Sequence, residues 1–252
     1  MAISNRSLER GLAILECFKP GVDLLAHRDW CEQTGLPKAT VTRLVRTLCD
    51  RGYLVQHAER GSYGLGPPIL SLARAMVLNH PLLAVMSPVV QEVAERTGAM
   101  VGFGTAHDLD IVYLEGANRD QTRPSRRIGQ GTRIPIASSS IGHAWLAGLA
   151  PSVRAREIAR LRAAIGRWSR DNTRAIESSL RQIQSAGYCA VSYNEGKHIA
   201  VGAPVRLAEN AVYAVNIAYR VPLASPEVVP RKIEQALQEL VQHALGSRGA
   251  GA

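Results

Sequence analysis

Hydrophobic positions in the first third of the chain recur at the spacing of short amphipathic helices. The first predicted helix spans residues 7–18, with Ser7 as its N-cap. A shorter and more polar helix is predicted over residues 27–34, and Gly35 is well suited to end it.

The third predicted helix, residues 37–51, has two contrasting faces. Its first turn accommodates Pro37, and one stripe of its surface is apolar. After it, two short runs of strand-forming residues, 53–57 and 62–65, are separated by a turn and predict a β-hairpin. Three helices and a hairpin in this order predict a winged helix-turn-helix. The apolar stripe consists of Val41, Leu44, Val45 and Leu48.

From about residue 82 the pattern changes to strand-like runs that bracket helices. This alternation predicts an α+β domain with a curved, mainly antiparallel sheet flanked by helices. The expected organisation is therefore a DNA-binding domain over 1–66, a linker helix over 67–80, a second domain over 81–247 and a disordered tail over 248–252. In the second domain, helices are expected over 82–97, 139–149, 153–164, 172–186 and 227–245, and strands over 100–105, 111–115, 134–136, 188–192, 198–207 and 211–219.

Composition changes this picture little. The formal net charge is +9, but residues 1–66 hold only nine Lys and Arg against seven Asp and Glu, so charge alone is a weak argument for DNA binding. No apolar run approaches membrane-spanning length and no signal peptide is apparent, which indicates a cytoplasmic protein. The four cysteines lack metal-ligand spacing, and neither a metal nor a cofactor is expected.

The polar face of the third predicted helix has the chemistry of a DNA-reading surface. Arginine pairs bidentately with guanine, while threonine and lysine side chains grip phosphates or touch a thymine methyl group. Side chains of the hairpin are placed to approach the DNA backbone or the minor groove. The candidate DNA-binding residues are Lys38, Thr40, Thr42, Arg43, Arg46 and Thr47 on the helix, and His57, Arg60 and Ser62 on the wing.

Motifs in both halves resemble the IclR family of bacterial transcription regulators. In the first half these are residues 7–15 (SLERGLAIL), 34–44 (TGLPKATVTRL), 51–54 (RGYL) and 63–66 (YGLG). In the second half they are residues 131–135 (GTRIP), 140–144 (SIGHA) and 202–205 (GAPV). The resemblance implies a regulator, not an enzyme, in which a winged helix-turn-helix is joined by a linker helix to a GAF-like effector domain. It also implies a homodimer, or a dimer of dimers, on a roughly palindromic double-stranded operator.

A small-molecule site is expected at the start of the helix near residue 139. Hydroxyls and free backbone N–H groups at a helix N-terminus favour an anion such as a carboxylate. The candidate effector-binding residues here are Ser138, Ser139, Ser140, Ile141 and Gly142; by their position in the family pattern, Cys189, Ser192, Ala200 and Asn216 join them. Acidic residues common in the family after residue 188 are absent, so the expected effector is an aromatic or aliphatic carboxylic acid from a catabolic pathway. Helix capping by the serines, and core packing of Cys189 and Ala200, are the alternatives.

Three other interpretations stay open. Ser139 and His143 stand four residues apart on a predicted helix, but no hydrolase motif accompanies them, so a serine hydrolase is a remote alternative. A DNA-bound protein without an effector is another. The arginine-rich stretches within 119–133 and 154–174 either widen the contact with DNA, pair with an acidic partner or form solvated surface.

Overall fold

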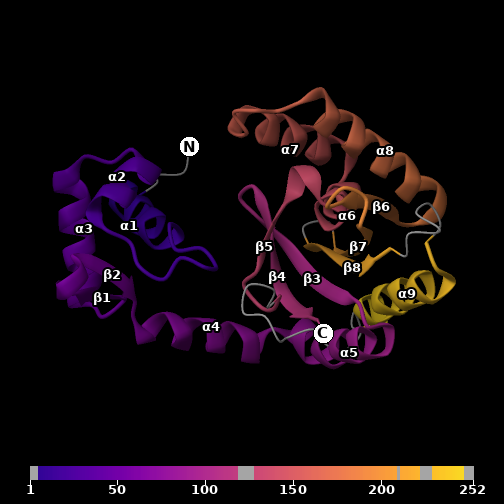
Figure 1. The fold of residues 1–252 in the computed structure, drawn as a ribbon, viewed down its shortest axis with the longest axis horizontal. Coiled ribbons are helices and arrows are strands. Elements are labelled where there is room, and N and C mark those ends of the chain that lie inside the picture. The colour runs from indigo at the N-terminus through magenta and orange to yellow at the C-terminus, as the bar shows by residue number, and fades with distance from the viewer. Residues whose placement is uncertain (1–4, 119–127, 209–210, 222–228, 247–252) are drawn as a thin grey trace. The chain divides into compact units, whose positions relative to one another are not determined.

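The computed structural model describes residues 5–118, 128–208, 211–221 and 229–246. The chain divides into two compact units, residues 1–79 and 80–252 (Figure 1). The arginine-rich segment 119–127, the tail 248–252 and the expected start of the last helix at Glu227 lie outside the described residues.

The first unit is the predicted winged helix-turn-helix. Asn5 caps its first helix instead of Ser7: the Asn5 side chain accepts hydrogen bonds from the backbone N–H groups of Ser7 and Leu8 at 3.1 and 3.2 Å. Pro37 is the N-cap of the third helix and not part of its first turn. The elements are α1 (Arg6–Glu16), α2 (His27–Thr34), α3 (Lys38–Asp50), β1 (Leu54–His57), β2 (Ser62–Leu65) and α4 (Pro67–Asn79).

The core of this unit forms where the three helices meet the hairpin. The indole of Trp30 is fully buried and donates a hydrogen bond to the backbone carbonyl of Ile14 at 3.0 Å, which ties α2 to α1. Val41 and Val45 of the predicted α3 stripe are also buried. Leu8 and Leu12, in contrast, are 61% and 50% exposed, because α1 buries the face that carries Ile14 and Cys17.

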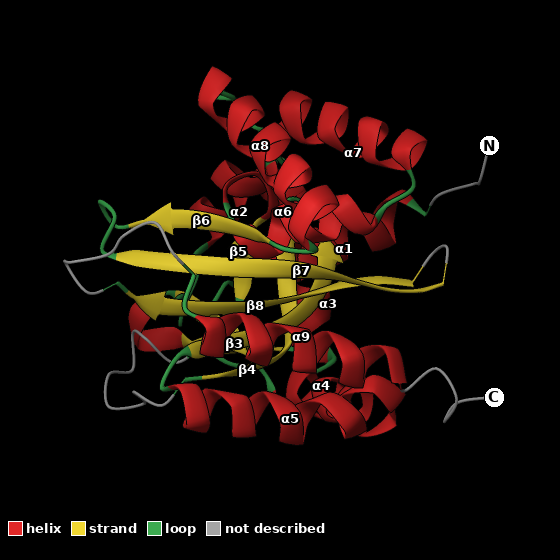
Figure 2. Ribbon diagram, turned by 90° about the vertical axis from the view of Figure 1, so that its right-hand side faces the viewer, coloured by secondary structure: helices red, strands yellow, loops and turns green. Residues whose placement is uncertain are grey.

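The second unit is built on a six-stranded sheet in the order β5-β4-β3-β8-β7-β6, in which every neighbouring pair is antiparallel (Figure 2). This confirms the expected mixed α+β fold with an antiparallel sheet. Its elements are α5 (Pro81–Thr97), β3 (Met100–His107), β4 (Asp110–Ala117), β5 (Arg133–Pro135), α6 (Ser140–Gly148), α7 (Pro151–Ala164), α8 (Arg170–Ala186), β6 (Cys189–Tyr193), β7 (His198–Ala208), β8 (Ala211–Arg220) and α9 (Arg231–Gly246).

Helices cover both faces of this sheet. Helices α5 and α9 pack on one face, which we call the α5 face, and α6 packs on the other, the α6 face, with α8 behind it (Figure 2). Pro88 lies inside α5, which continues through it to Gly98. One core cluster, which includes Ile111, Ile136 and Ile141, lies between the α6 face and its helices.

A β-bulge interrupts the pairing of β4 with β3. Phe103 pairs with Glu115 and Gly104 pairs with Tyr113, so Leu114 is the extra residue. Side chains two positions apart on a regular strand point to the same face, but the bulge sends Tyr113 to the α6 face and Glu115 to the α5 face. There the Glu115 carboxylate accepts a hydrogen bond from the hydroxyl of Ser87 on α5 at 2.6 Å.

No single helix in the described ranges is long and apolar enough to span a membrane, although α4 and α5 together would reach that length and composition across the break between them. All four cysteines are free thiols.

Candidate DNA-binding and ligand-binding sites

Helix α3 presents the predicted polar face to solvent. Lys38, Thr42, Arg43, Arg46 and Thr47 are exposed, while Thr40 is half-buried. The faces separate because Val41 and Val45 are held in the core, while the residue that follows each of them, Thr42 and Arg46, is exposed. The arrangement leaves the two guanidinium groups available for base edges or phosphates.

Two hydroxyls on this helix already have partners. Thr42 Oγ1 donates to the carbonyl of Lys38 at 2.9 Å, and Thr47 Oγ1 donates to the carbonyl of Arg43 at 3.0 Å. Their oxygens still accept hydrogen bonds, but a contact in which they donate to phosphate requires these bonds to break. The methyl groups of both residues remain in contact with solvent.

On the wing, His57 and Arg60 are exposed, as a backbone or minor-groove contact requires. Ser62 does not fit the prediction, because it is only 8% exposed and its hydroxyl has no hydrogen-bond partner among the described residues. It pairs with His57 and shares its face of the hairpin, the face opposite the one on which Tyr63 packs against the core.

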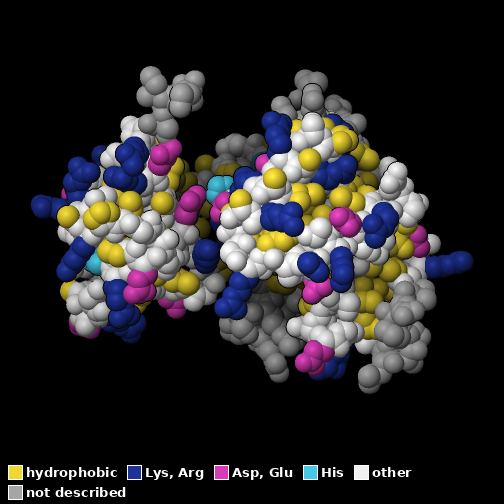
Figure 3. Space-filling view, turned by 90° about the horizontal axis from the view of Figure 1, so that it is seen from above, with side chains coloured by type: hydrophobic (Ala, Val, Ile, Leu, Met, Phe, Trp, Pro, Cys, Tyr) yellow, Lys and Arg dark blue, Asp and Glu magenta, His cyan; other side chains and the backbone are white. Residues whose placement is uncertain are grey.

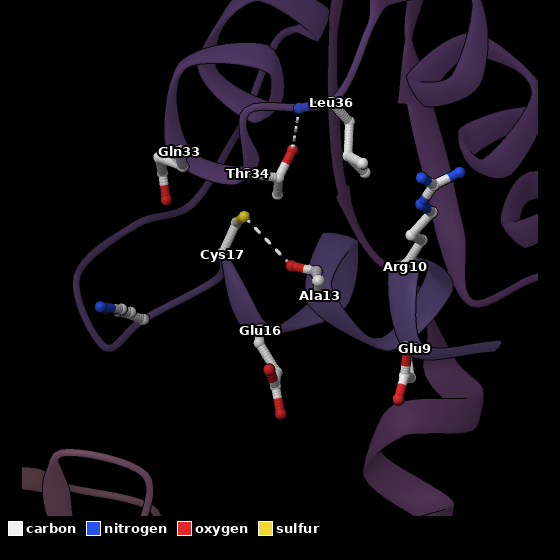
Figure 4. A pocket seen from close by; sticks show the side chains of 9 residues that line it. Glu9, Arg10, Ala13, Glu16, Cys17, Gln33, Thr34 and Leu36 are labelled. Carbon is white, nitrogen blue, oxygen red and sulfur yellow. Dashed lines mark hydrogen bonds between the residues drawn. The ribbon is translucent and has the colours of Figure 1, made fainter. Parts of the chain in front are cut away.

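A hollow of about 380 Å³ lies between the end of α1 and the turn that joins α2 to α3 (Figure 4). Cys17 donates to the carbonyl of Ala13 at 3.2 Å, and the N–H of Leu36 donates to Thr34 Oγ1 at 3.3 Å. Charges of both signs line it, and none of the predicted site residues does. We therefore assign it no ligand.

The serine-rich segment of the second unit is divided by the fold into three different roles. Ser139 is the N-cap of α6: its hydroxyl accepts from the N–H of Gly142 at 3.1 Å and donates to the carbonyl of Pro135 at 2.6 Å. Ser138 is exposed in the turn before it. Ser140 is 1% exposed, and its hydroxyl has no partner among the described residues. Ser139 therefore has the helix-capping role that was the alternative to effector binding.

The predicted sheet residues do not all share a face. Cys189 pairs with Gly202 and Gly202 with Asn216, so Cys189 and Asn216 point to the α6 face. Ala200 lies on that face too, two positions from Gly202. Ser192 lies three positions after Cys189 on β6. Because three is an odd number, its side chain points to the α5 face, where it is exposed. Its assignment to the same site was wrong because strand side chains alternate.

Gly202 brings the sheet and the start of α6 into contact. A Cβ atom at this position would lie 2.5 Å from the carbonyl oxygen of Ser140. Cys189 Sγ, beside it, donates to the same carbonyl at 3.5 Å. Burial raises the pKa of the Cys189 thiol to about 12, so it is a packing group and not a nucleophile.

Tyr113, which bonds directly to Asn216, was not among the predicted site residues. The Tyr113 hydroxyl donates to Asn216 Oδ1 at 2.9 Å, and the two residues are 1% and 3% exposed. Burial raises the pKa of Tyr113, so the hydroxyl keeps its proton. A glycine makes room for the pair, since a Cβ at Gly102 would lie 2.5 Å from Asn216 Oδ1. The sequence pattern would have placed the Tyr113 side chain on the α6 face only if the bulge at Leu114 had been predicted.

His143 does not pair with Ser139. Its ring is fully buried, with Nδ1 2.8 Å from Ser179 Oγ and Nε2 3.2 Å from the carbonyl oxygen of Ala137. A carbonyl only accepts, so Nε2 carries the proton and Nδ1 accepts from the serine. Burial lowers the pKa of His143, and the ring joins α6 to α8 as a neutral group.

Within the described ranges, no group of three or more His, Cys, Asp or Glu side chains is placed to hold a metal ion. The predicted ligand residues of the sheet and of the start of α6 are also covered: Ser140, Cys189, Ala200 and Asn216 are at most 8% exposed. The polar groups of the α6 face are closed over by neighbouring side chains.

Comparison with known proteins identifies both units. Residues 7–58 match the IclR helix-turn-helix domain, and residues 74–244 match the family described as bacterial transcriptional regulator IclR C-terminal. The HTH-type transcriptional regulator TsaQ1/TsaQ2 of Comamonas testosteroni is 30% identical over 244 residues, which is 94% of this chain and 86% of that protein.

Solved structures show the same fold. An IclR family transcriptional regulator from Brucella abortus superposes with a TM-score of 0.81 at 27% identity, over 99% of this chain and 94% of that one. An IclR homologue from Microbacterium hydrocarbonoxydans, complexed with 4-hydroxybenzoate, superposes with a TM-score of 0.73 at 23% identity, over 97% and 100% of the two chains. The exposed basic face of α3, the wing beside it and the family matches in both units lead to one conclusion: this chain belongs to the IclR family of DNA-binding transcriptional regulators, which are not enzymes.

Proposed function

We propose that this regulator binds its operator as a dimer and that a small organic acid, bound between the α6 face and the start of α6, changes its affinity for DNA. Residues 1–66 would read DNA, 67–80 would link the units and 81–247 would bind the effector. The observation that carries the effector proposal is the buried, unpartnered hydroxyl of Ser140 near the Tyr113–Asn216 pair.

The chemistry of this region favours a ligand that accepts hydrogen bonds. An unsatisfied buried hydroxyl costs free energy, and a ligand oxygen would remove that cost. The start of a helix adds a partial positive charge. Strands β6, β7 and β8 contain no Asp or Glu in their described residues, so no carboxylate of theirs repels an acid. The ring of 4-hydroxybenzoate, bound by the Microbacterium relative, also suits the apolar surroundings of Tyr113.

Because the polar groups are now covered, binding must open the packing around Ser140 and Asn216. A ligand that favours such an opened state shifts the equilibrium by its differential affinity for the two states, typically about 1–3 kcal/mol between coupled sites. Helix α5 packs on the same sheet and follows the linker, so a change in β4 reaches it through the Glu115–Ser87 hydrogen bond.

A thermal-shift screen against aromatic and aliphatic carboxylic acids tests the effector proposal. At 100 times its dissociation constant a ligand adds about 2.7 kcal/mol, or roughly 5–10 °C for a unit of this size. We expect Ser140→Ala and Asn216→Ala to reduce the shift and Ser192→Ala, on the opposite face, to leave it unchanged. A bound acid must also change operator affinity; no shift across the panel, or an equal shift in all variants, rejects the site.

For DNA reading, we propose that Arg43 and Arg46 contact bases or phosphates, with Lys38, Thr40, Thr42, Thr47, His57 and Arg60 in support. Selection of bound duplexes from a random pool supplies the operator. If Arg43 or Arg46 reads a base, its substitution by alanine relaxes the selected sequence at one position; if it grips phosphate, affinity falls uniformly. Arg74→Ala, on exposed α4, is the control.

The dimer proposal rests on an apolar surface that the first unit leaves uncovered. No residue of α4 is buried, and Leu70, Leu72 and Leu78 are 75%, 57% and 64% exposed. A groove of about 610 Å³ between α1, α3 and α4 continues this surface, lined by apolar residues that include Leu8, Leu12 and Ile69. Continuous apolar patches of this kind mark association sites, and a second copy supplies a matching one.

Leu72→Glu tests the dimer, because it places a charge in the groove. We expect the mass measured by sedimentation equilibrium to fall towards the monomer's 27.2 kDa, with Ser71→Glu on the same helix as the charge-matched control. An unchanged mass for both variants would reject this surface as the interface.

A further inference from the structure

Most of the excess positive charge of this DNA-binding chain lies outside its DNA-binding unit. Residues 1–66 hold nine basic and seven acidic residues, whereas residues 151–186 hold eight arginines and only three acidic residues. This second segment comprises α7, α8 and their connection. More than half of the formal net charge of +9 thus lies on these two helices and their connection.

Six of the eight arginines are free to bind an external partner. Arg160 is held by Glu157 at 2.9 Å and by Asp108, and Arg154 turns towards the carbonyl of Ala147 at 3.4 Å. The other six are exposed, and among the described residues only Arg174 of these six has a carboxylate oxygen within 4 Å, that of Asp171 at 3.9 Å. We call these six the α7–α8 arginine surface: Arg156, Arg162, Arg167, Arg170, Arg174 and Arg181.

The helical repeat organises half of this surface into a line. Arg170, Arg174 and Arg181 are spaced by four and seven residues, so they lie on one side of α8, where one carboxylate, that of Glu177, lies among them. The line spans about 16 Å, given a rise of about 1.5 Å per residue, which is close to five base-pair steps of about 3.4 Å each. Figure 3 looks onto this side of the second unit and shows Lys and Arg side chains spread over it.

A surface of this kind requires an anionic partner, and a second copy of the unit does not supply one. Residues 80–252 hold twenty basic against fourteen acidic residues, so two such units repel one another on average. DNA is the polyanion that the protein already holds through its first unit. Once that unit is bound, weak phosphate contacts by the tethered second unit act at an effective concentration in the millimolar range.

We propose that the α7–α8 arginine surface is a second DNA contact, which binds backbone phosphates without reading sequence. The inference rests on DNA binding by the first unit and is independent of the effector proposal. Each phosphate neutralised releases counterions, so every contact adds about 0.9 to the slope of log affinity against log salt concentration.

The test measures that slope for the full-length protein on a 60-base-pair duplex of mixed sequence, by fluorescence anisotropy in KCl. Arg170→Gln with Arg181→Gln removes two charges from the surface; Arg231→Gln with Lys232→Gln removes two exposed charges from the start of α9 and is the matched control. We expect the first pair to reduce the slope by about 1–2 and to weaken binding in 100 mM salt by about 5- to 50-fold. We expect the control pair to change both the slope and the affinity far less.

Three results would overturn the proposal. An unchanged slope in the α8 pair means that these arginines do not contact DNA. An equal fall in both pairs means that overall charge, and not this surface, is responsible. A change of mass in light scattering, with the slope unchanged, assigns the surface to a contact between proteins. Circular dichroism of each variant confirms that its fold is intact.

Discussion

Tyr113→Phe is the most direct test of the buried polar pair on the α6 face. The substitution removes one oxygen atom and keeps the ring, so packing with the surrounding core is preserved. It leaves Asn216 Oδ1, in a side chain that is 3% exposed, without the hydrogen bond that Tyr113 donates at 2.9 Å. A buried acceptor left unsatisfied costs about 1–3 kcal/mol.

That cost translates into a measurable change of melting temperature. A unit of this size loses about 2–4 °C per kcal/mol, so we expect the calorimetric transition of the second unit to fall by about 2–12 °C. Tyr188→Phe is the control, because Tyr188 lies beside Leu237 of α9, away from the pair, and its hydroxyl has no hydrogen-bond partner in the described part of the chain. A double-mutant cycle with Asn216→Ala then isolates the coupling between the two residues.

A fall of less than about 1 °C in Tyr113→Phe would contradict this prediction, since a cost of about 1 kcal/mol corresponds to about 2 °C. Equal falls in the test and control variants would also refute it. A cycle in which the two substitutions add independently would show that the bond is not formed in solution.

Three further predictions concern single side chains. Asn5→Ala removes the cap of α1 and should destabilise the first unit by about 0.5–2 kcal/mol in urea unfolding, while Ser7→Ala should have little effect. Gly202→Ala forces a Cβ to within 2.5 Å of the Ser140 carbonyl and should lower the melting temperature of the second unit; no change would mean that α6 can move away. Burial lowers the pKa of His143 in the folded state, so below about pH 6.5 the unfolded chain binds the extra proton more readily and stability falls with acidification. His143→Gln should lose that part of the pH dependence, and a stability profile identical to wild type would contradict it.

Periodicity predicted most of the fold because each element buries one face. The third helix was predicted over 37–51 and spans Lys38–Asp50, and the hairpin strand 62–65 was predicted at its observed bounds. The N-cap of α1 was misplaced because Asn5 and Ser7 are both good capping residues, and only backbone geometry decides between them.

The candidate ligand site was less predictable, for two physical reasons. Counting from Cys189 in steps of two excludes Ser192, so that error was avoidable from alternation alone. The face on which Tyr113 lies could not be predicted by such counting. The extra residue Leu114 breaks the alternation, so that the side chains before and after it no longer follow one pattern of faces. Which serine would cap α6 and which would be buried also depended on where the helix began.

The absence of buried residues in α4 has a consequence for the reach of the molecule. An isolated helix of 13 residues is only marginally stable in water. As a helix α4 spans about 20 Å, whereas the same residues extended reach roughly 43 Å. A partner that covers its leucines therefore sets the length of the connection as well as the mass of the assembly. On dilution to monomers the connection would lengthen and slacken, and the separation of two DNA-reading units would become a function of protein concentration.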